Sequence, residues 1–249
     1  MKKIAVITGG TGGIGLATAK ELAKDGYTIC LNGIDAEAGK NAVAELEKAG
    51  ATVEFYPFDG TNEAAVNEGI KTIGEKHGVI DVLINNTGGL GGRSRFEEMT
   101  TEFFRSVMAL NLDTAFFASR AAIPFLKKSE NASIINFASN AAYNAGGPGA
   151  GIYGVSKGAV LLLTRALAKD LAEFGIRVNA VSPGTIDTPF HDQIRATKPE
   201  VFESWKNNIL MKRLGQASEV GTVISFLVSE KASFMTGEVV QINGGQDLL

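Results

Sequence analysis

The sequence predicts a single α/β domain built as a doubly wound parallel sheet with helices on both faces. Three observations predict it: apolar runs alternate with helical patterns along the chain, a glycine-rich loop follows the first run, and no linker interrupts the pattern. Strand–helix alternation requires crossover connections, and right-handed crossovers place helices on both faces of a parallel sheet. We therefore expect residues 1–249 to form one domain around a seven-stranded sheet.

The expected elements follow from apolar spacing, taken in order along the chain. The strands are short runs rich in β-branched residues, at residues 4–8, 28–31, 52–56, 79–84, 133–137, 177–181 and 238–242. Helical spacing of apolar residues occupies residues 16–24, 36–49, 63–76, 101–127, 153–174 and 219–229. Residues 187–212 contain no clean strand and follow a strand end, so we expect them to form a lid over a ligand.

The first strand runs directly into a glycine-rich loop that precedes a helix. The loop reads Thr-Gly-Gly-Thr-Gly-Gly-Ile-Gly over residues 8–15. Glycines allow a tight turn and let backbone N–H groups approach a pyrophosphate, which then lies at the positive end of the helix dipole. The order strand, glycine loop, helix therefore predicts a Rossmann-type dinucleotide site. A nucleoside triphosphate loop is excluded because no Gly-Lys-Ser/Thr follows the glycines.

Composition limits the possible classes of partner and location. The chain is 45% hydrophobic and 20% charged, and its net charge of −3 argues against a nucleic acid or an anionic membrane as partner. Cys30 is the only cysteine, so we expect no intrachain disulfide, no metal site and a buried thiol. The apolar run behind Met1 is shorter than the roughly 7 to 15 residues of a signal core, and no run approaches a membrane span of about 18. We expect a soluble, cytoplasmic protein.

Tyr153 and Lys157 are four residues apart in a helical pattern, which places their side chains on one helix face, about one turn apart. A phenol normally keeps its proton until about pH 10. A nearby ammonium favours the phenolate and lowers this pKa, which suits proton exchange with an alcohol or ketone oxygen. The pair alone also fits a half-buried tyrosine beside a solvated lysine. The remaining motifs decide between this interpretation and a catalytic pair.

Taken together, these motifs resemble those of the short-chain dehydrogenase/reductase family over essentially the whole chain. The resemblance rests on the loop at 8–15, Asp59-Gly60, Asn85-Asn86-Thr87-Gly88, Asn111, Ser139, Tyr153-x-x-x-Lys157, and Pro183-Gly184 followed by Ile186 and Thr188. Thr87 stands where the family usually has Ala, and Asn243 stands where an Asp is commoner. Neither difference predicts another function. The resemblance implies hydride transfer between a nicotinamide cofactor, which supplies the hydride, and a ketone or secondary alcohol.

The resemblance implies catalytic roles for four residues. Tyr153 would give a proton to the carbonyl oxygen during reduction and take it back during oxidation. Lys157 would lower the pKa of Tyr153 and bind the nicotinamide ribose. Ser139 would orient and polarise the same oxygen, and Asn111 would hold a water that links Lys157 to solvent. As alternatives, Ser139 would serve as a turn former or N-cap, and Asn111 would cap or kink a helix.

The resemblance also implies the cofactor contacts. Asp59 would accept a hydrogen bond from the adenine amino group, and Ile186 and Thr188 would bind the nicotinamide carboxamide. Asn86 would line the adenosine ribose, whereas Asn85 would tie neighbouring strands together. The expected cofactor-binding residues are Gly9, Thr11, Gly12, Gly13, Ile14, Gly15, Asp35, Asp59, Gly60, Asn86, Gly88, Tyr153, Lys157, Pro183, Gly184, Ile186 and Thr188.

The end of the second strand bears on the choice between NAD(H) and NADP(H). An acid there bonds the ribose 2′-hydroxyl, whereas an arginine binds the 2′-phosphate. Gly33 stands where the acid is expected and Ile34 where the arginine is expected. Residues 10–12 carry no cation either, and Asp35 would stand close to a phosphate, so NAD(H) is favoured over NADP(H). Asp35 could reach the ribose or cap the helix that begins at residue 36, and both interpretations stay open.

The sequence does not name the substrate beyond a small carbonyl or alcohol compound. We expect the pocket wall to include Asn140, Ala141, Asn144, residues 146–151 and the segment 187–212, with His191 on the surface of that segment. Sugar or polyol oxidoreduction and NADPH-dependent 3-oxoacyl thioester reduction both stay open. A cofactor-binding scaffold without redox activity is a further alternative, although such proteins usually lose a catalytic residue and this chain keeps its Ser, Tyr and Lys.

The long helical patterns at 101–127 and 153–174 resemble those that pair between subunits in the family. Residues 159–163 are apolar on nearly all sides, which a monomer surface tolerates poorly. We therefore expect a homotetramer.

Overall fold

The computed structural model describes residues 3–248, apart from the side chain of Gln193. Its main sheet has seven parallel strands in the order β3-β2-β1-β4-β5-β6-β9, which confirms the predicted fold class. The strands are β1 (Lys3–Thr8), β2 (Tyr27–Gly33), β3 (Val53–Pro57), β4 (Val82–Asn85), β5 (Ser133–Phe137), β6 (Arg177–Pro183) and β9 (Val239–Ile242). The order reverses between β1 and β4, and a crevice for ligands opens at such a switch point.

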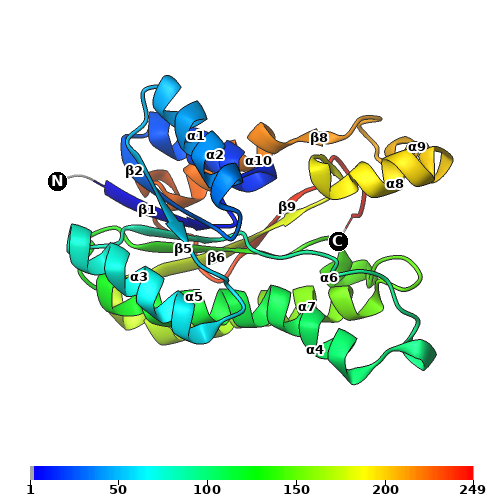
Figure 1. Ribbon diagram of the computed structural model, residues 1–249, viewed down its shortest axis with the longest axis horizontal. Helices are drawn as coiled ribbons and strands as arrows, with labels where there is room; N and C mark the ends of the chain where they lie inside the picture. The colour runs from blue at the N-terminus through cyan, green and yellow to red at the C-terminus, as the bar shows by residue number, and fades with distance from the viewer. Residues whose placement is uncertain (1–2, 249) are drawn as a thin grey trace.

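Helices cover both faces of this sheet, as Figure 1 shows. One face carries α1 (Gly13–Lys24), α2 (Ala36–Lys48) and α10 (Ala217–Val228), and the other carries α3 (Glu63–His77), α5 (Thr114–Leu126) and α7 (Gly151–Leu171). Alternate side chains of β1 point to opposite faces of the sheet: Ala5 and Ile7 join the core under α1, whereas Ile4 and Val6 join the core under α3. All four are buried, as expected for strands covered on both sides.

Side-chain caps fix where several helices begin after the strands. Asp35 accepts hydrogen bonds from Glu37 N (2.8 Å) and Ala38 N (3.1 Å), so it is the N-cap of α2. Asn62 caps α3 in the same way by accepting from Ala65 N at 3.1 Å. The capping interpretation of Asp35 is therefore confirmed.

The helix expected at 101–127 is divided into three parts. These are α4 (Thr101–Met108), a π-helical segment η2 (Ala109–Asp113) and α5. Asn111 lies in the π segment and its side chain donates to Val107 O, four residues earlier, at 3.0 Å. Because a π turn adds only one residue, the apolar pattern continues through it and the sequence does not reveal it.

The segment at 187–212 is mostly helical, which the sequence did not predict. It follows a two-residue strand, β7 (Ile186–Asp187), which pairs with β8 (Gly215–Gln216). The segment then forms a 3₁₀ turn η4 (Pro189–His191), α8 (Asp192–Thr197) and α9 (Pro199–Asn208). The remaining short elements are η1 (Phe96–Glu98), α6 (Ala141–Asn144), η3 (Ala172–Phe174) and η5 (Glu230–Ala232). Among residues 3–248, no helix combines the length and apolar character needed to cross a bilayer.

Candidate active site

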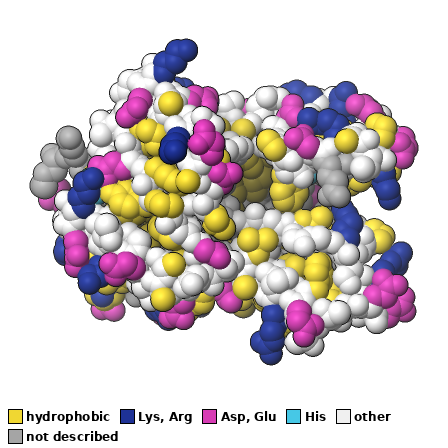
Figure 2. Space-filling model, in the orientation of Figure 1, with side chains coloured by type: hydrophobic (Ala, Val, Ile, Leu, Met, Phe, Trp, Pro, Cys, Tyr) yellow, Lys and Arg dark blue, Asp and Glu magenta, His cyan; other side chains and the backbone are white. Residues whose placement is uncertain are grey.

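A cleft of about 1370 Å³ opens at the carboxyl ends of the central strands. In Figure 2 the surface is hollowed between α8–α9 at the upper right and the chain below them. Part of the glycine loop and three of the four residues implied in catalysis line it. The predicted residues that line the cleft are Gly9, Gly12, Gly13, Ile14, Asn86, Gly88, Ser139, Tyr153, Lys157, Pro183, Gly184, Ile186 and Thr188.

The glycine loop leaves the start of α1 open toward the cleft. Gly9 (φ +60°) and Gly13 (φ +51°) adopt left-handed backbone conformations that favour glycine. A Cβ on Gly15 would lie 2.5 Å from Gly9 O, so only glycine allows the loop to pack against the helix. Gly12 is the N-cap of α1, has no side-chain cap, and has no atom within 4 Å of where a Cβ would stand. Backbone N–H groups at an open helix start fit a pyrophosphate.

Two asparagines at the end of β4, Asn85 and Asn86, have structural contacts. Asn86 Nδ2 donates to Thr8 O (3.1 Å) and Gly9 O (2.7 Å), and so holds the glycine loop to the end of β4. Asn85 Nδ2 donates to Ser119 Oγ and Asn136 Oδ1, both at 2.8 Å. The bond to Asn136 joins β4 to β5, which confirms the prediction that Asn85 ties neighbouring strands, and the bond to Ser119 reaches α5.

Ser139 and Tyr153 come from different elements and meet in the cleft. Ser139 follows β5, where its Oγ accepts a hydrogen bond from Ala141 N at 3.2 Å, and Tyr153 lies in the first turn of α7. Burial raises the pKa of Tyr153 above its usual 10, and a side-chain hydrogen bond with Ser139 opposes that rise. A substrate oxygen near Tyr153 would therefore meet two hydroxyl groups at once.

Lys157 lies one turn along α7 and is almost completely buried, at 4% exposure. Its Nζ donates to Phe137 O at 2.8 Å and lies 5.8 Å from the centroid of the Tyr153 ring. Burial lowers the pKa of Lys157 to about 8. Burial dominates the pKa of Tyr153 in this structure and the Lys157 ammonium is bonded to a carbonyl, so the role of Lys157 in lowering the pKa of Tyr153 stays a prediction.

Asn111 reaches the loop after β4 from the π segment. Its Oδ1 accepts from Gly89 N at 3.0 Å, and its Nδ2 donates to Gly89 O at 2.8 Å. A Cβ on Gly88 would lie 2.7 Å from Asn111 Oδ1 and 2.9 Å from Lys157 Nζ. Gly88 therefore separates two side chains implied in catalysis. The kink interpretation of Asn111 fits its place in the π segment, and its role in holding a water stays a prediction.

Six predicted residues do not line this cleft: Thr11, Gly15, Asp35, Asp59, Gly60 and Asn111. Asp59 Oδ1 accepts from the backbone N and the hydroxyl of Thr61, both at 2.8 Å.

Thr11 packs against the end of β2. A Cβ on Gly33 would lie 2.7 Å from Thr11 Cγ2, so Thr11 occupies the space that an acidic side chain at Gly33 would need. No sequence signal indicates this contact, because Thr11 lies in the glycine loop and Gly33 is the last residue of β2.

The α8–α9 segment contributes an aromatic cluster to the cleft wall. His191 lies 4.9 Å from Phe190 and 6.1 Å from Trp205, measured between ring centroids. Since His191 lines the cleft, the expectation that it lies on the outer surface is wrong. Burial, together with the nearby Arg195, lowers the pKa of His191 below 6.5. The helical spacing of three residues between Phe202 and Trp205 is the sequence pattern that could have identified α9.

The chain end forms part of the cleft, which sequence reasoning missed. Gln246 lines it, and its Oε1 accepts from the backbone N (2.8 Å) and the hydroxyl (3.1 Å) of Thr185. Asp247 Oδ2 accepts from Asn140 Nδ2 (2.6 Å) and Asn144 Nδ2 (3.0 Å), two residues of the expected pocket wall. These contacts join residues far apart in the chain, so no local motif announces them.

A doubly wound sheet with an open glycine loop and a Ser–Tyr–Lys group in one cleft defines a class, the nicotinamide-dependent oxidoreductases. A family model described as enoyl-(acyl carrier protein) reductase matches residues 9–247. The chain belongs to the short-chain dehydrogenase/reductase family, whose members are NAD(P)-dependent and act on alcohol or carbonyl groups.

Individual relatives cover nearly the whole chain. A cyclopentanol dehydrogenase from Comamonas sp. (strain NCIMB 9872) is 36% identical over 98% of this chain and 96% of its own length. A 3-oxoacyl-(acyl-carrier-protein) reductase from Thermotoga maritima is 35% identical over 98% of this chain and 97% of its own. The crystal structure of a glucose/ribitol-type short-chain dehydrogenase/reductase from Brucella melitensis has a TM-score of 0.90 at 34% identity, covering 100% of both chains.

Proposed function

We propose that the protein interconverts a secondary alcohol and a ketone, with Tyr153 as acid–base and NAD(H) as the preferred cofactor. The observation that carries this proposal is that Ser139, Tyr153 and Lys157 line the same cleft as the open start of α1. When bound, the nicotinamide accepts the hydride during oxidation and supplies it during reduction.

The chain's own residues hold the cofactor and move the proton. Backbone N–H groups at Gly12 and Gly13 bind the pyrophosphate, and Ile186 and Thr188 position the carboxamide end. In the reductive direction, Tyr153 Oη gives its proton to the substrate oxygen. Ser139 Oγ donates to the same oxygen and stabilises the charge that develops there.

Lys157 and Asn111 act behind Tyr153. The Lys157 ammonium binds the ribose and supplies positive charge near the phenol when a proton leaves it. Asn111 holds the loop at Gly89 in place and serves the proton path through a bound water. At the other end of the cofactor, Asp59 accepts from the adenine amino group, beside Gly60.

The preference for NAD(H) rests on charge at the end of β2. Asp35 is anionic and lies next to the exposed Ile34, where an arginine would be needed to bind a 2′-phosphate. Asp35 accepts both capping hydrogen bonds through Oδ1, so the same carboxylate can cap α2 and also contact the ribose of a cofactor.

The substrate end of the cleft combines apolar and polar walls. Phe190, Trp205 and Leu90 line it together with Asn140 and Asn144. This lining suits a compact ring or chain with one reacting oxygen, and the cyclopentanol dehydrogenase is a relative of that kind. We propose that residues 187–212 act as a lid over this end, within a single domain of residues 1–249.

Reduction of a 3-oxoacyl thioester with NADPH is the second candidate. It is favoured by the likeness to the Thermotoga reductase and by two cations, Arg93 and Lys198, that line the cleft. These cations would meet the phosphate of a carrier group.

Initial rates distinguish the two candidates. The purified protein is assayed with NAD and NADP on cyclopentanol and other secondary alcohols, and with NADH and NADPH on ketones and 3-oxoacyl thioesters. We expect the highest kcat/KM with NAD(H) and a secondary alcohol or ketone. A preference for NADPH with thioesters selects the second candidate, and no turnover with any pair rejects both.

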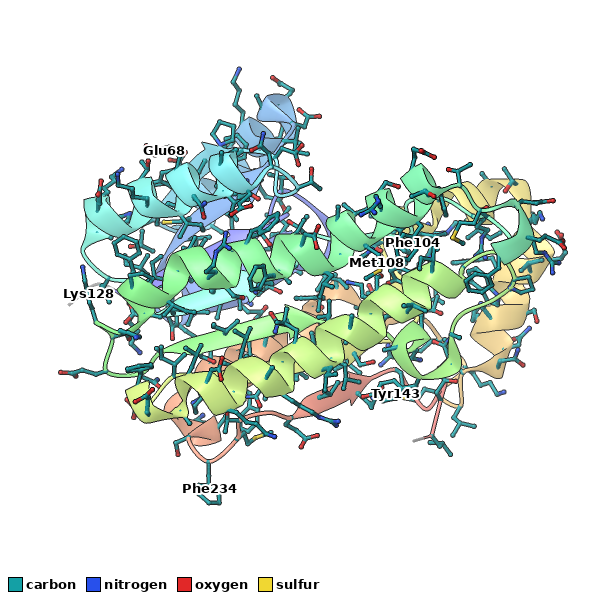
Figure 3. All side chains as sticks on the ribbon, turned by 90° about the horizontal axis from the view of Figure 1, so that it is seen from below. Glu68, Phe104, Met108, Lys128, Tyr143 and Phe234 are labelled. Atoms are coloured by element: carbon teal, nitrogen blue, oxygen red, sulfur yellow. The ribbon has the colours of Figure 1, made fainter. Side chains whose placement is uncertain are left out.

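We also propose a homotetramer. Large apolar side chains are exposed on adjoining helices: Phe104 on α4, Phe116 on α5, and Val155 and Leu162 on α7. Figure 3 looks onto this side of the molecule, with α5 and α7 lying across it and Phe104 labelled. Light scattering at micromolar concentration should give a mass near four times 26.2 kDa, and a monomer mass contradicts the proposal.

A further inference from the structure

A group of three metal-binding side chains lies on the opposite side of β2 from the glycine-loop helix. Cys30 comes from β2, Glu54 from its neighbour β3, and His77 from the last position of α3. Cys30 and Glu54 are direct partners in the parallel pairing, so both side chains point toward α3. Nothing in the proposed reaction uses these residues.

Two of the three distances between their ligand atoms match a tetrahedral metal centre. Cys30 Sγ lies 3.7 Å from His77 Nε2, which lies 3.3 Å from Glu54 Oε2, and all three atoms are within 4.8 Å of one another. Bond lengths of about 2.3 Å to sulfur and 2.0 to 2.1 Å to nitrogen and oxygen, at tetrahedral angles, place S and N roughly 3.5 Å apart and N and O roughly 3.3 Å apart. An ion would fit these two distances as they stand, and it would require the Cys30 sulfur and the Glu54 oxygen, which lie within 4.8 Å of each other, to stand roughly 3.5 Å apart.

We propose that Cys30, Glu54 and His77 bind a divalent transition metal ion of the Zn²⁺ type, with a fourth position left to solvent. Thiolate, imidazole and carboxylate are the ligands that Zn²⁺ takes in proteins. The two anionic ligands would balance the charge of the ion. An entry route exists on the side of Glu54 and His77, whose side chains are 25% and 14% exposed, whereas Cys30 is fully buried.

The bound ion would fasten an edge of the sheet. In the described sheet β3 is the outermost strand and pairs with β2 alone. An ion at this position joins β2, β3 and the end of α3. A helix that returns between parallel strands ends near their amino ends, so the site lies away from the cleft at their carboxyl ends.

The surroundings of Glu54 compete with the metal. Lys76 Nζ donates to Glu54 Oε2 at 2.8 Å, and the Tyr56 hydroxyl donates to the same oxygen. Burial raises the pKa of Glu54, whereas these two hydrogen bonds lower it and hold it below its usual value. Burial raises the pKa of Cys30 to about 12, and metal binding must therefore displace the thiol proton.

Cobalt(II) titration of the tag-free full-length protein tests the site. Because Cys30 is the only cysteine, a cobalt–thiolate charge-transfer band can arise nowhere else in the chain. We expect that band, together with a rise in Tm as Co²⁺ or Zn²⁺ is added. Cys30→Ser should abolish the band, and His77→Ala should weaken binding at least roughly tenfold.

Two matched variants keep the test decisive. His191→Ala removes the only other histidine and should leave the band unchanged. Lys76→Met removes the competing cation and should tighten binding roughly two- to fivefold, a change that a purely structural hydrogen-bond network does not predict. No thiolate band in the folded wild-type protein overturns the proposal, and so does a band that persists unchanged in His77→Ala.

Discussion

The buried ammonium of Lys157 donates to the carbonyl oxygen of Phe137 at 2.8 Å, where β5 ends beneath α7. This bond holds Lys157 in the wall of the cleft one helical turn from Tyr153. It also places a cation where little water reaches it, since Lys157 is 4% exposed. The same position that suits catalysis therefore lowers the stability of the fold.

Lys157→Met should stabilise the protein at neutral pH. A pKa lowered from 10.5 to about 8 by burial corresponds to a cost of about 3 kcal/mol for the charged side chain. The lost hydrogen bond to Phe137 offsets about 1 kcal/mol of the gain. We expect the free energy of unfolding at pH 7, measured by urea denaturation, to rise by about 1 to 3 kcal/mol while turnover is lost.

The pH dependence of that gain has a definite sign. Between pH 8 and 10.5 the unfolded wild-type chain binds more protons at Lys157 than the folded chain, so wild-type stability rises with pH relative to the variant. The advantage of Lys157→Met should be full below pH 8 and fade toward pH 10.5. A difference that stays constant across this range contradicts the argument.

Gly88→Ala should disable the site without unfolding the protein. The new methyl group would stand 2.7 Å from Asn111 Oδ1 and 2.9 Å from Lys157 Nζ, so both side chains must move. We expect kcat/KM to fall at least roughly 100-fold, because small displacements in an active site are costly. Circular dichroism should show a folded chain.

Gly89→Ala is the matched control for this substitution. A Cβ on Gly89 would meet only Leu110 Cδ2, at an ordinary contact distance of 3.5 Å. Its loss of activity should be much smaller than that of Gly88→Ala. Equal losses would show that the loop as a whole, and not the gap between Asn111 and Lys157, limits the reaction.

The sequence predicted the residues that gather at strand ends, because each motif follows a strand directly. Parallel strands bring their carboxyl ends to one edge, so Ser139 after β5 and Ile186 after β6 had to approach the glycine loop. Contacts between segments far apart in the chain could not be predicted in this way. Thr11 packing on Gly33, and Gln246 bonded to Thr185, depend on tertiary packing alone.

The helices α8 and α9 escaped prediction for a different reason. They are short, and Pro199 interrupts the apolar pattern between them, although it is well placed at the first position of a helix. As a result, the predicted pocket wall included residues 187–212 but not the aromatic contact that His191 and Trp205 form there. The π segment around Asn111 was missed because its single extra residue leaves the apolar pattern intact.

Substitutions at the end of β2 should change the cofactor preference. Ile34→Arg combined with Asp35→Ser adds a cation for a 2′-phosphate and removes the nearby anion. Ile34 is 72% exposed, so the fold should tolerate the arginine. We expect the affinity for NADPH, followed by nicotinamide fluorescence, to increase at least about tenfold relative to that for NADH.

Asp35→Ser and Asp35→Ala separate charge from capping. Serine keeps an oxygen that can accept from Glu37 N and Ala38 N, whereas alanine does not. Only the alanine variant should lose about 1 kcal/mol of stability, and both should bind NADPH better than the wild type. Unchanged cofactor binding in both variants would remove Asp35 from the cofactor site.

Tyr153→Phe should remove turnover while cofactor binding persists. The change deletes the hydroxyl that bonds to Ser139 and leaves the ring in place. We expect kcat to fall at least about 1000-fold, with a dissociation constant for NADH within roughly threefold of wild type. Substantial remaining turnover would exclude Tyr153 as the acid–base. Unchanged biological activity in this variant would favour the scaffold alternative.

Trp205 should report on the cleft, because it is the only tryptophan in the chain and lines the wall beside His191. A ligand that enters under α8–α9 should alter the emission of Trp205.

The same emission should depend on pH. Protonated histidine quenches a neighbouring indole, and the pKa of His191 is lowered by burial and by Arg195. Emission should therefore fall with decreasing pH, with a midpoint below 6.5. His191→Phe should abolish that titration but keep the response to ligand. A midpoint at or above 6.5 would place His191 in solvent, and a ligand response that vanishes with the imidazole would mean that the signal comes from His191 alone.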